Sequence, residues 1–178
     1  KAVTPPLRIG DIVETGTSQE QGVDLIVIGK RGEAADFAKM HLGSNLERIA
    51  RAAKKPVFVA NRAFKPIEKV LIAFDGGVSA MKAVDYVARD PLFAGLSCTV
   101  VTVGKPSGDA KRGLDDAKAT LAAGGHQAEV MVIEGQPETA LGDLVDAKGY
   151  DLLVMGAYGH SRIRSMIIGS TTTQMIRT

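Results

Sequence analysis

The chain has 178 residues, of which 45% are hydrophobic, and its 22 basic and 20 acidic side chains give a formal net charge of +2. This length suits one large domain or two small ones, and the apolar content is ample for a packed core. The basic residues are scattered, without the clustered stripe that nucleic-acid binding usually shows. The longest apolar runs span about five residues, against the roughly 20 of a membrane helix, so we expect a globular protein that contacts neither nucleic acid nor membrane.

Cys98 is the only cysteine in the sequence, which excludes an intrachain disulfide and favours a reducing, cytoplasmic location. It lies in an apolar segment and is expected to be a small buried side chain. The three histidines lack the spacing of a zinc site, so no metal ligand is expected among the protein side chains. The sequence starts at Lys1 rather than at Met, and we expect that the natural N-terminus is absent.

An internal repeat organises the sequence. Residues 24–29 (DLIVIG) match residues 151–156 (DLLVMG), and a Gly-Ser pair follows each of them, at 43–44 and at 169–170. Such self-similarity predicts a tandem arrangement, here with an incomplete first copy. The expected domains are the C-terminal half of a first domain, residues 1–62, and a second domain that lacks its last strand, residues 67–178.

The second copy alternates short apolar runs with amphipathic segments. Strands are expected at 70–74, 98–103, 129–133 and 151–155. A first helix is expected to start at Ser79, which would cap it, and further helices are expected at 109–123 and 138–148. Strands that alternate with helices of about 10 to 15 residues indicate βαβ units. The predicted fold class is therefore α/β, with a doubly wound, Rossmann-like parallel sheet.

Residues suited to ligand binding follow three of these strands. Ligands of open parallel sheets lie beyond the carboxyl ends of the strands, so Asp75, Val103 and the pair Met155 and Gly156 are expected to line one crevice. Asp75 would accept hydrogen bonds from a sugar or base, while Val103 and Met155 would contact adenine. Asp followed by two glycines is also common in turns, so Asp75 alone fits a turn or cap residue equally well.

A glycine-rich segment completes the expected crevice, with the spacing Gly156-x2-Gly159-x9-Gly169-Ser170-Thr171. Glycines allow backbone conformations that a Cβ would forbid, and they let a ligand approach the main chain closely. Ser170, Thr171 and Thr172 would present hydroxyl and free N–H groups at the positive end of a helix. That arrangement is a natural phosphate site.

The Asp75-Gly-Gly-x-Ser79 segment and this glycine spacing together resemble the universal stress protein family, whose ATP-binding members share both features. The resemblance implies an adenine-nucleotide-binding fold and a cytoplasmic stress-response or regulatory protein. It implies ATP as ligand, with Mg²⁺ or Mn²⁺ held through the phosphates, and leaves slow ATP hydrolysis or autophosphorylation open. It assigns Asp75 and Val103 to adenosine, Gly156 and Gly159 to ribose and phosphates, and Gly169, Ser170 and Thr171 to the phosphates.

The first copy departs from this pattern. Its spacing, Gly29-x2-Gly32-x10-Gly43-Ser44, is one residue longer, and the counterpart of Asp75 lies outside the chain. It therefore predicts at most a second, degenerate nucleotide site. In the family the last strand of each domain pairs with its counterpart, and the resemblance implies a homo-oligomer, such as a dimer, built through the strand from Pro56 to Ala60.

Other functions remain open beside ATP binding. The sequence has no paired carboxylates, Ser/His arrangement or Walker motif, so no catalytic residue is predicted and an efficient enzyme is not expected. A nucleotide-independent, dimerising interaction scaffold is the main alternative. An ATP-pyrophosphatase-type enzyme is suggested only by a superficial likeness of residues 75–79 to a phosphate loop in which Ser and Asp stand in the other order.

Overall fold

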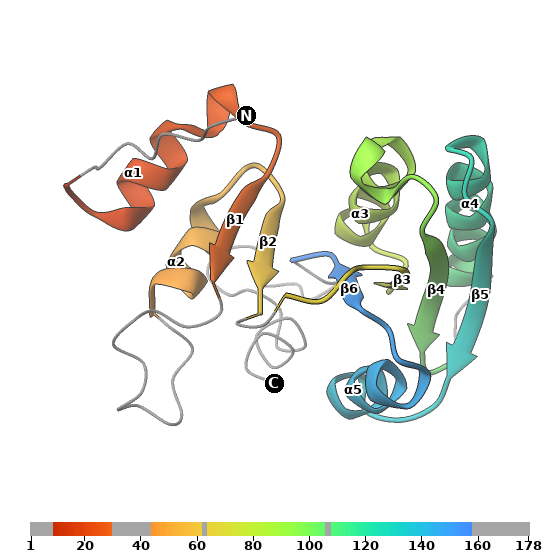
Figure 1. Ribbon diagram of the computed structural model, residues 1–178. Helices are drawn as coiled ribbons and strands as arrows, with labels where there is room; N and C mark the ends of the chain where they lie inside the picture. Colours follow the sequence, from red (N-terminus) through yellow and green to blue (C-terminus); the bar gives the residue numbers. More distant parts are fainter. Residues whose placement is uncertain (1–8, 30–43, 62–63, 106–107, 158–178) are drawn as a thin grey trace. The chain divides into compact units, whose positions relative to one another are not determined.

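The computed structural model describes residues 9–29, 44–61, 64–105 and 108–157 (Figure 1). They belong to two compact units, the first containing the described residues up to 61 and the second those from 64 onward. Across these ranges, no helix combines the length and the apolar character needed to cross a membrane.

The first unit contains two parallel strands, β1 (Ile26–Gly29) and β2 (Val57–Ala60), with Ile26 opposite Val57. Two helices accompany them, α1 (Ile12–Ser18) and α2 (Ser44–Ala52), and a 3-10 turn at Glu20–Gly22 follows α1. Leu46 and Ile49 of α2 are buried, three residues apart and so on one helix face. They are the buried apolar side chains among the described residues of this unit.

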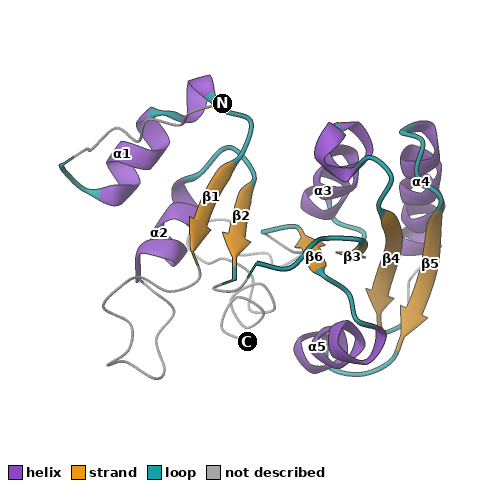
Figure 2. Ribbon diagram, viewed as in Figure 1, coloured by secondary structure: helices purple, strands orange, loops and turns teal. Residues whose placement is uncertain are grey.

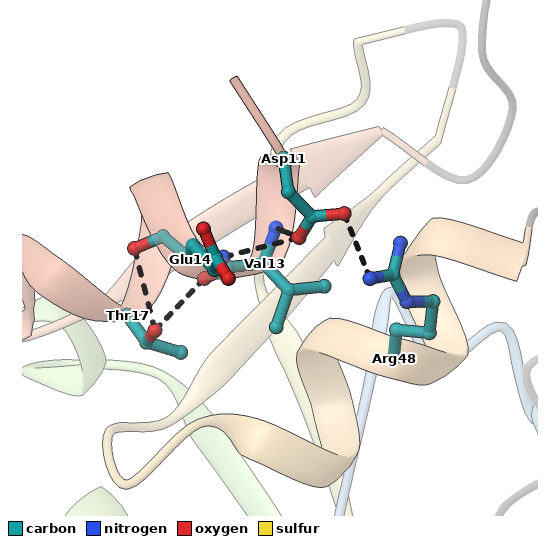
Figure 3. Close-up of polar contacts among 5 residues, drawn as sticks. All are labelled: Asp11, Val13, Glu14, Thr17 and Arg48. Atoms are coloured by element: carbon teal, nitrogen blue, oxygen red, sulfur yellow. Dashed lines mark hydrogen bonds and ion pairs between the residues drawn. The ribbon is translucent and has the colours of Figure 1, made fainter.

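An ion pair ties the two helices of the first unit together (Figure 3). Asp11 caps α1, because its Oδ1 accepts hydrogen bonds from the N–H groups of Val13 and Glu14 at 2.9 and 3.2 Å. Its Oδ2 lies 2.7 Å from a guanidinium nitrogen of Arg48 in α2. Arg48 first, and then the two backbone bonds, hold the pKa of Asp11 below its ordinary value. None of the residues of α1 is buried, and this contact joins the start of α1 to α2.

The second unit alternates strands and helices. In chain order these are β3 (Lys69–Ala73), α3 (Val78–Arg89), a 3-10 turn (Pro91–Phe93), β4 (Ser97–Val103), α4 (Gly108–Ala123), β5 (Ala128–Ile133), α5 (Pro137–Lys148) and β6 (Leu152–Met155). The strands form one sheet in the order β5-β4-β3-β6, and all neighbours are parallel (Figure 2). The expected α/β fold with a parallel sheet is confirmed, and each strand lies within one residue of its expected bounds.

Helices cover both faces of this sheet. Val70 and Ile72 of β3 belong to the core beneath α3 and α4, whereas Leu71 between them packs with Leu141 of α5. All three β3 side chains are fully buried. This is why the strand reads as an uninterrupted apolar run rather than an alternating one. Cys98 is buried in the same core, as predicted.

The start of α3 differs from the prediction. The helix begins at Val78 with Gly77 as its N-cap, and no side chain bonds to its first turn. Ser79 therefore lies inside the helix, and its expected role as a cap is wrong. The cause is the turn before it, in which the Gly77 N–H donates to Asp75 Oδ1 at 2.8 Å and brings the helix start forward.

Asp151 fixes the amino edge of the sheet. Its Oδ2 accepts hydrogen bonds from the N–H groups of Glu68 and Lys69, both at 3.0 Å, and its Oδ1 lies 2.6 Å from Lys65 Nζ. The side chain is 8% exposed. Lys65 first, followed by the two N–H groups, lowers the pKa of Asp151 to about 2. The carboxylate thus joins the starts of β3 and β6.

Acid titration tests this contact. The folded-state pKa lies below the ordinary 3.8, so ionised Asp151 stabilises the fold above that pH, and the stabilisation is lost as pH falls from 3.8 towards 2. Asp151→Asn is expected to lower the urea midpoint near neutral pH, and the difference from the wild type should shrink below about pH 4. Asp85→Asn is the control, because Asp85 forms only an exposed pair with Arg89 at 3.7 Å. Equal effects of both substitutions at every pH would contradict the assignment.

Candidate functional site at the carboxyl edge of the sheet

The strand order of the second unit reverses at β3. From β3 the chain steps to β4 and β5 on one side, and then returns to β6 on the other side. The helices of the outward steps, α3 and α4, share one core cluster, whereas α5 of the return step belongs to the other. In open parallel sheets such a reversal leaves a crevice at the carboxyl ends of the flanking strands, where ligands bind.

The register brings three predicted site residues to one level of this edge. Ala73 pairs with Val101 of β4 on one side and with Met155 of β6 on the other. Asp75 and Val103 each lie two residues beyond a member of this row, and Gly156 lies one residue beyond it. Because neighbouring strands are about 4.8 Å apart, the ends of β3, β4 and β6 meet at one place.

Asp75 lies in a tight turn with an exposed side chain. Gly76 adopts φ +80°, a conformation that favours glycine, and the Gly77 N–H binds Asp75 Oδ1. The two roles considered for Asp75, turn residue and ligand-binding residue, are thus compatible, because the turn holds the carboxylate at the edge of the sheet. An ionised carboxylate only accepts hydrogen bonds, so it suits a ligand with hydroxyl or amino donors.

Apolar side chains lie beside this carboxylate. Val103 is half-buried and packs on the α5 side of the sheet, with the cluster that contains Val101 and Leu141. Met155 is also half-buried, and it shares a strand face with Leu153, which belongs to the same cluster. Both predicted apolar contacts therefore lie on one side of the sheet at its carboxyl edge.

Two helix starts face the same edge. The N-caps of α3 and α5 are Gly77 and Gln136, and neither N-cap residue forms a side-chain capping hydrogen bond. The first N–H groups of a helix lack intrahelical partners and carry the positive end of its dipole. The edge thus offers a negative side chain next to positive backbone, which matches a ligand that has both donor and anionic groups.

Gly156 is required for a reason that sequence reasoning missed. Its backbone does not adopt a positive φ. The prediction that Gly156 has a conformation that a Cβ would forbid is therefore wrong. Instead, a Cβ built on Gly156 would lie 2.8 Å from Ser79 Oγ and 2.9 Å from the Ala80 backbone nitrogen. The end of β6 is in close contact with the first turn of α3, and glycine is what permits it.

Thr102 and Phe74 also shape the site, although the sequence analysis did not single them out. Thr102 Oγ1 donates a buried hydrogen bond of 2.8 Å to the Phe74 carbonyl, next to Asp75. The Phe74 ring is buried against Gly113 of α4, where a Cβ would lie 3.1 Å from the ring. The available signal for Thr102 was a polar residue directly before the last residue of the predicted strand.

Several predicted site residues lie outside the described part of the chain: Gly32, Gly43, Gly159, Gly169, Ser170, Thr171 and Thr172. In the first unit, Gly29 is the last residue of β1 and Ser44 the first of α2. Within the described ranges there is no group of three His, Cys, Asp or Glu side chains that could hold a metal ion.

The architecture places the second unit among α/β proteins with an open parallel sheet whose strand order reverses at β3. Comparison with known proteins narrows this class. A sequence profile described as the universal stress protein family matches residues 12–61 and 66–178. The chain belongs to this family.

Individual relatives are also universal stress proteins. The chain is 45% identical over 156 residues, 86% of its length, to the universal stress protein Slr1230 of Synechocystis, and it spans only 54% of that protein. A universal stress protein structure from Archaeoglobus fulgidus is 26% identical, with a TM-score of 0.72, over 98% of this chain and 64% of that one. A universal stress protein solved in complex with cAMP is 27% identical, with a TM-score of 0.52, over 64% of this chain and 90% of that one.

The contact between β6 and α3 predicts a steric effect at Gly156. Gly156→Ala should destabilise the second unit by roughly 1–3 kcal/mol, because backbone atoms of α3 must move to admit the methyl group. Gly142→Ala is the matched control, since a Cβ there meets nothing within 4 Å and the helix gains up to about 1 kcal/mol. Chemical denaturation measures both. A Gly156→Ala protein as stable as the Gly142→Ala protein would contradict the packing described.

Proposed function

We propose that the second unit binds ATP at the carboxyl edge of its sheet. The observation that carries this proposal is the register, which brings the exposed carboxylate of Asp75 to the level of Val103 and Gly156 at the strand-order reversal. Asp75 accepts from the ribose or base, and Val103 and Met155 contact adenine. Gly156, Gly159, Gly169, Ser170, Thr171 and Thr172 bind ribose and phosphates, and Mg²⁺ or Mn²⁺ is held by the phosphates.

Membership of the family supports a nucleotide ligand. A relative of 27% identity forms a complex with cAMP, which shares adenine, ribose and a phosphate with ATP. The intact glycine and hydroxyl spacing from Gly156 to Thr172 supports the triphosphate over a cyclic monophosphate, because it supplies several backbone and hydroxyl donors in one loop. The protein would act as a cytoplasmic stress-response regulator, with at most slow ATP hydrolysis or autophosphorylation.

The domain organisation of this proposal is a tandem one. Residues 1–62 form the C-terminal half of a first domain, and residues 67–178 form the second domain without its last strand. Two matched stretches of the family profile, and a relative of which this chain spans only 54%, support this reading. The glycines of the first copy, Gly29, Gly32 and Gly43 with Ser44, form a degenerate second site, and the strand from Pro56 to Ala60 pairs copies into a homo-oligomer.

Calorimetric titration with Mg–ATP tests the site. Asp75→Asn keeps the acceptor for the Gly77 N–H but removes the charge, and the affinity for ATP should fall about tenfold or more. Asp90→Asn is a matched control, because Asp90 accepts from the Leu92 N–H at 2.9 Å in a similar turn at the other end of α3. It should leave binding unchanged. No heat at millimolar ATP in the wild-type protein would end the proposal.

A nucleotide-independent scaffold is the second candidate, favoured by the longer glycine spacing of the first copy. Replacement of Gly159 by Leu separates the two functions. If the protein acts through ATP, the variant loses the ATP signal, because a side chain blocks the approach of the phosphates to the main chain. If it acts as a scaffold, partner capture and oligomer mass are the same in the variant and the wild type, as measured by pull-down and sedimentation.

A further inference from the structure

The hydrogen-bond ladder between β3 and β4 stops at the site. The Phe74 N–H still donates to the Val101 carbonyl at 2.8 Å, as a parallel ladder requires. The next bond of that ladder would run from the Val103 N–H to the Phe74 carbonyl, and it is not formed between these two described residues. The Phe74 carbonyl instead accepts from the Thr102 hydroxyl at 2.8 Å. A side chain thus replaces a backbone donor at the last rung.

This exchange has a clear physical basis. Thr102 is 6% exposed and Phe74 is 4% exposed, and the hydrogen bond between the hydroxyl and the carbonyl is buried. A buried carbonyl without a donor is costly, and a donor must therefore come from the protein. The Phe74 ring, packed against Gly113, keeps this residue in place while the chain beyond it turns away from β4.

The consequence falls on Asp75 and Val103. Once the ladder ends, β3 is free to turn at Gly76, and the carboxylate of Asp75 is held at the edge by the Gly77 N–H. The Val103 N–H faces β3 in the parallel register but does not bond to the Phe74 carbonyl. The ladder therefore ends at the Phe74–Val101 bond, and the Phe74 carbonyl beyond it is taken by the hydroxyl of Thr102.

We propose that Thr102 is a positioning residue of the nucleotide site, which ends the β3–β4 ladder and so holds the Asp75 turn and the Val103 N–H open towards the ligand. The inference rests on the proposed function for the identity of the ligand. The role of Thr102 in the ladder does not depend on that identity. Removal of the hydroxyl lets the Phe74 carbonyl accept from the Val103 N–H, which extends the ladder by one hydrogen bond and moves Asp75.

Three variants test this role. Thr102→Val keeps the shape of the side chain without the hydroxyl, and Thr102→Ser keeps the hydroxyl without the methyl group. Thr99→Val is the matched control, because Thr99 is a buried threonine of the same strand, 4% exposed, and lies three residues before Thr102. The affinity for Mg–ATP should fall at least about tenfold in Thr102→Val and stay within about twofold of wild type in the other two variants.

Amide hydrogen exchange separates this role from a general loss of stability, which would make exchange faster rather than slower. Exchange of the Val103 N–H should be slower in Thr102→Val than in the wild type, because a new ladder bond protects it, and unchanged in Thr102→Ser and Thr99→Val. Wild-type affinity in Thr102→Val, equal losses in Thr102→Ser, or faster Val103 exchange in Thr102→Val would each overturn the proposal. If the wild type binds no ATP, the proposed function fails, and Val103 exchange alone then decides the role of Thr102.

Discussion

The fixed register of β4, β3 and β6 is the constraint on which the candidate site depends. Val70, Leu71 and Ile72 of β3 alternate between two cores, and all three are fully buried. A slip of one residue would exchange the two faces and force every core contact to change. The burial of side chains in the middle of the strands therefore determines how the strand ends are aligned at the edge. Asp75, Val103 and Gly156 reach a common level because aliphatic side chains several residues earlier leave no other alignment.

Charge is arranged around this edge in a complementary way. The carboxylate of Asp75 is engaged by a backbone N–H at the start of α3, where the helix dipole favours a negative group. At the opposite edge, the carboxylate of Asp151 performs a structural task, since it receives two strand N–H groups and a lysine and is largely buried. The two aspartates follow and precede strands of one sheet. The exposed one is available to a ligand, while the buried one is saturated by protein donors.

Much of the fold was predictable from the sequence. Apolar runs identified all four strands of the second unit. In β3 the run is continuous because the strand is buried on both faces, whereas the edge strand β5 exposes Val130 and Val132. The positions of Asp75, Val103 and Met155 at strand ends followed from the same runs. The predicted phosphate-binding residues from Gly159 to Thr172 lie outside the described ranges and stay predictions.

What the sequence could not predict depends on contacts between segments far apart in the chain. Ser79 looked like a cap because of its residue type, but the turn at Asp75 determines where α3 begins. Thr102 could not be connected with Phe74, 28 residues earlier, before the register of two strands was known. The packing role of Gly156 required the position of α3 in space. Local patterns gave the elements, and tertiary contacts gave the details of the site.

The close contact between Gly156 and the first turn of α3 changes how relatives of this chain should be compared. A glycine that the fold itself demands would persist through evolution in homologues that have lost every ligand. Its presence in an alignment is therefore poor evidence for nucleotide binding. Classification of such homologues as binders or non-binders should give more weight to positions without a packing role, such as the exposed carboxylate at Asp75.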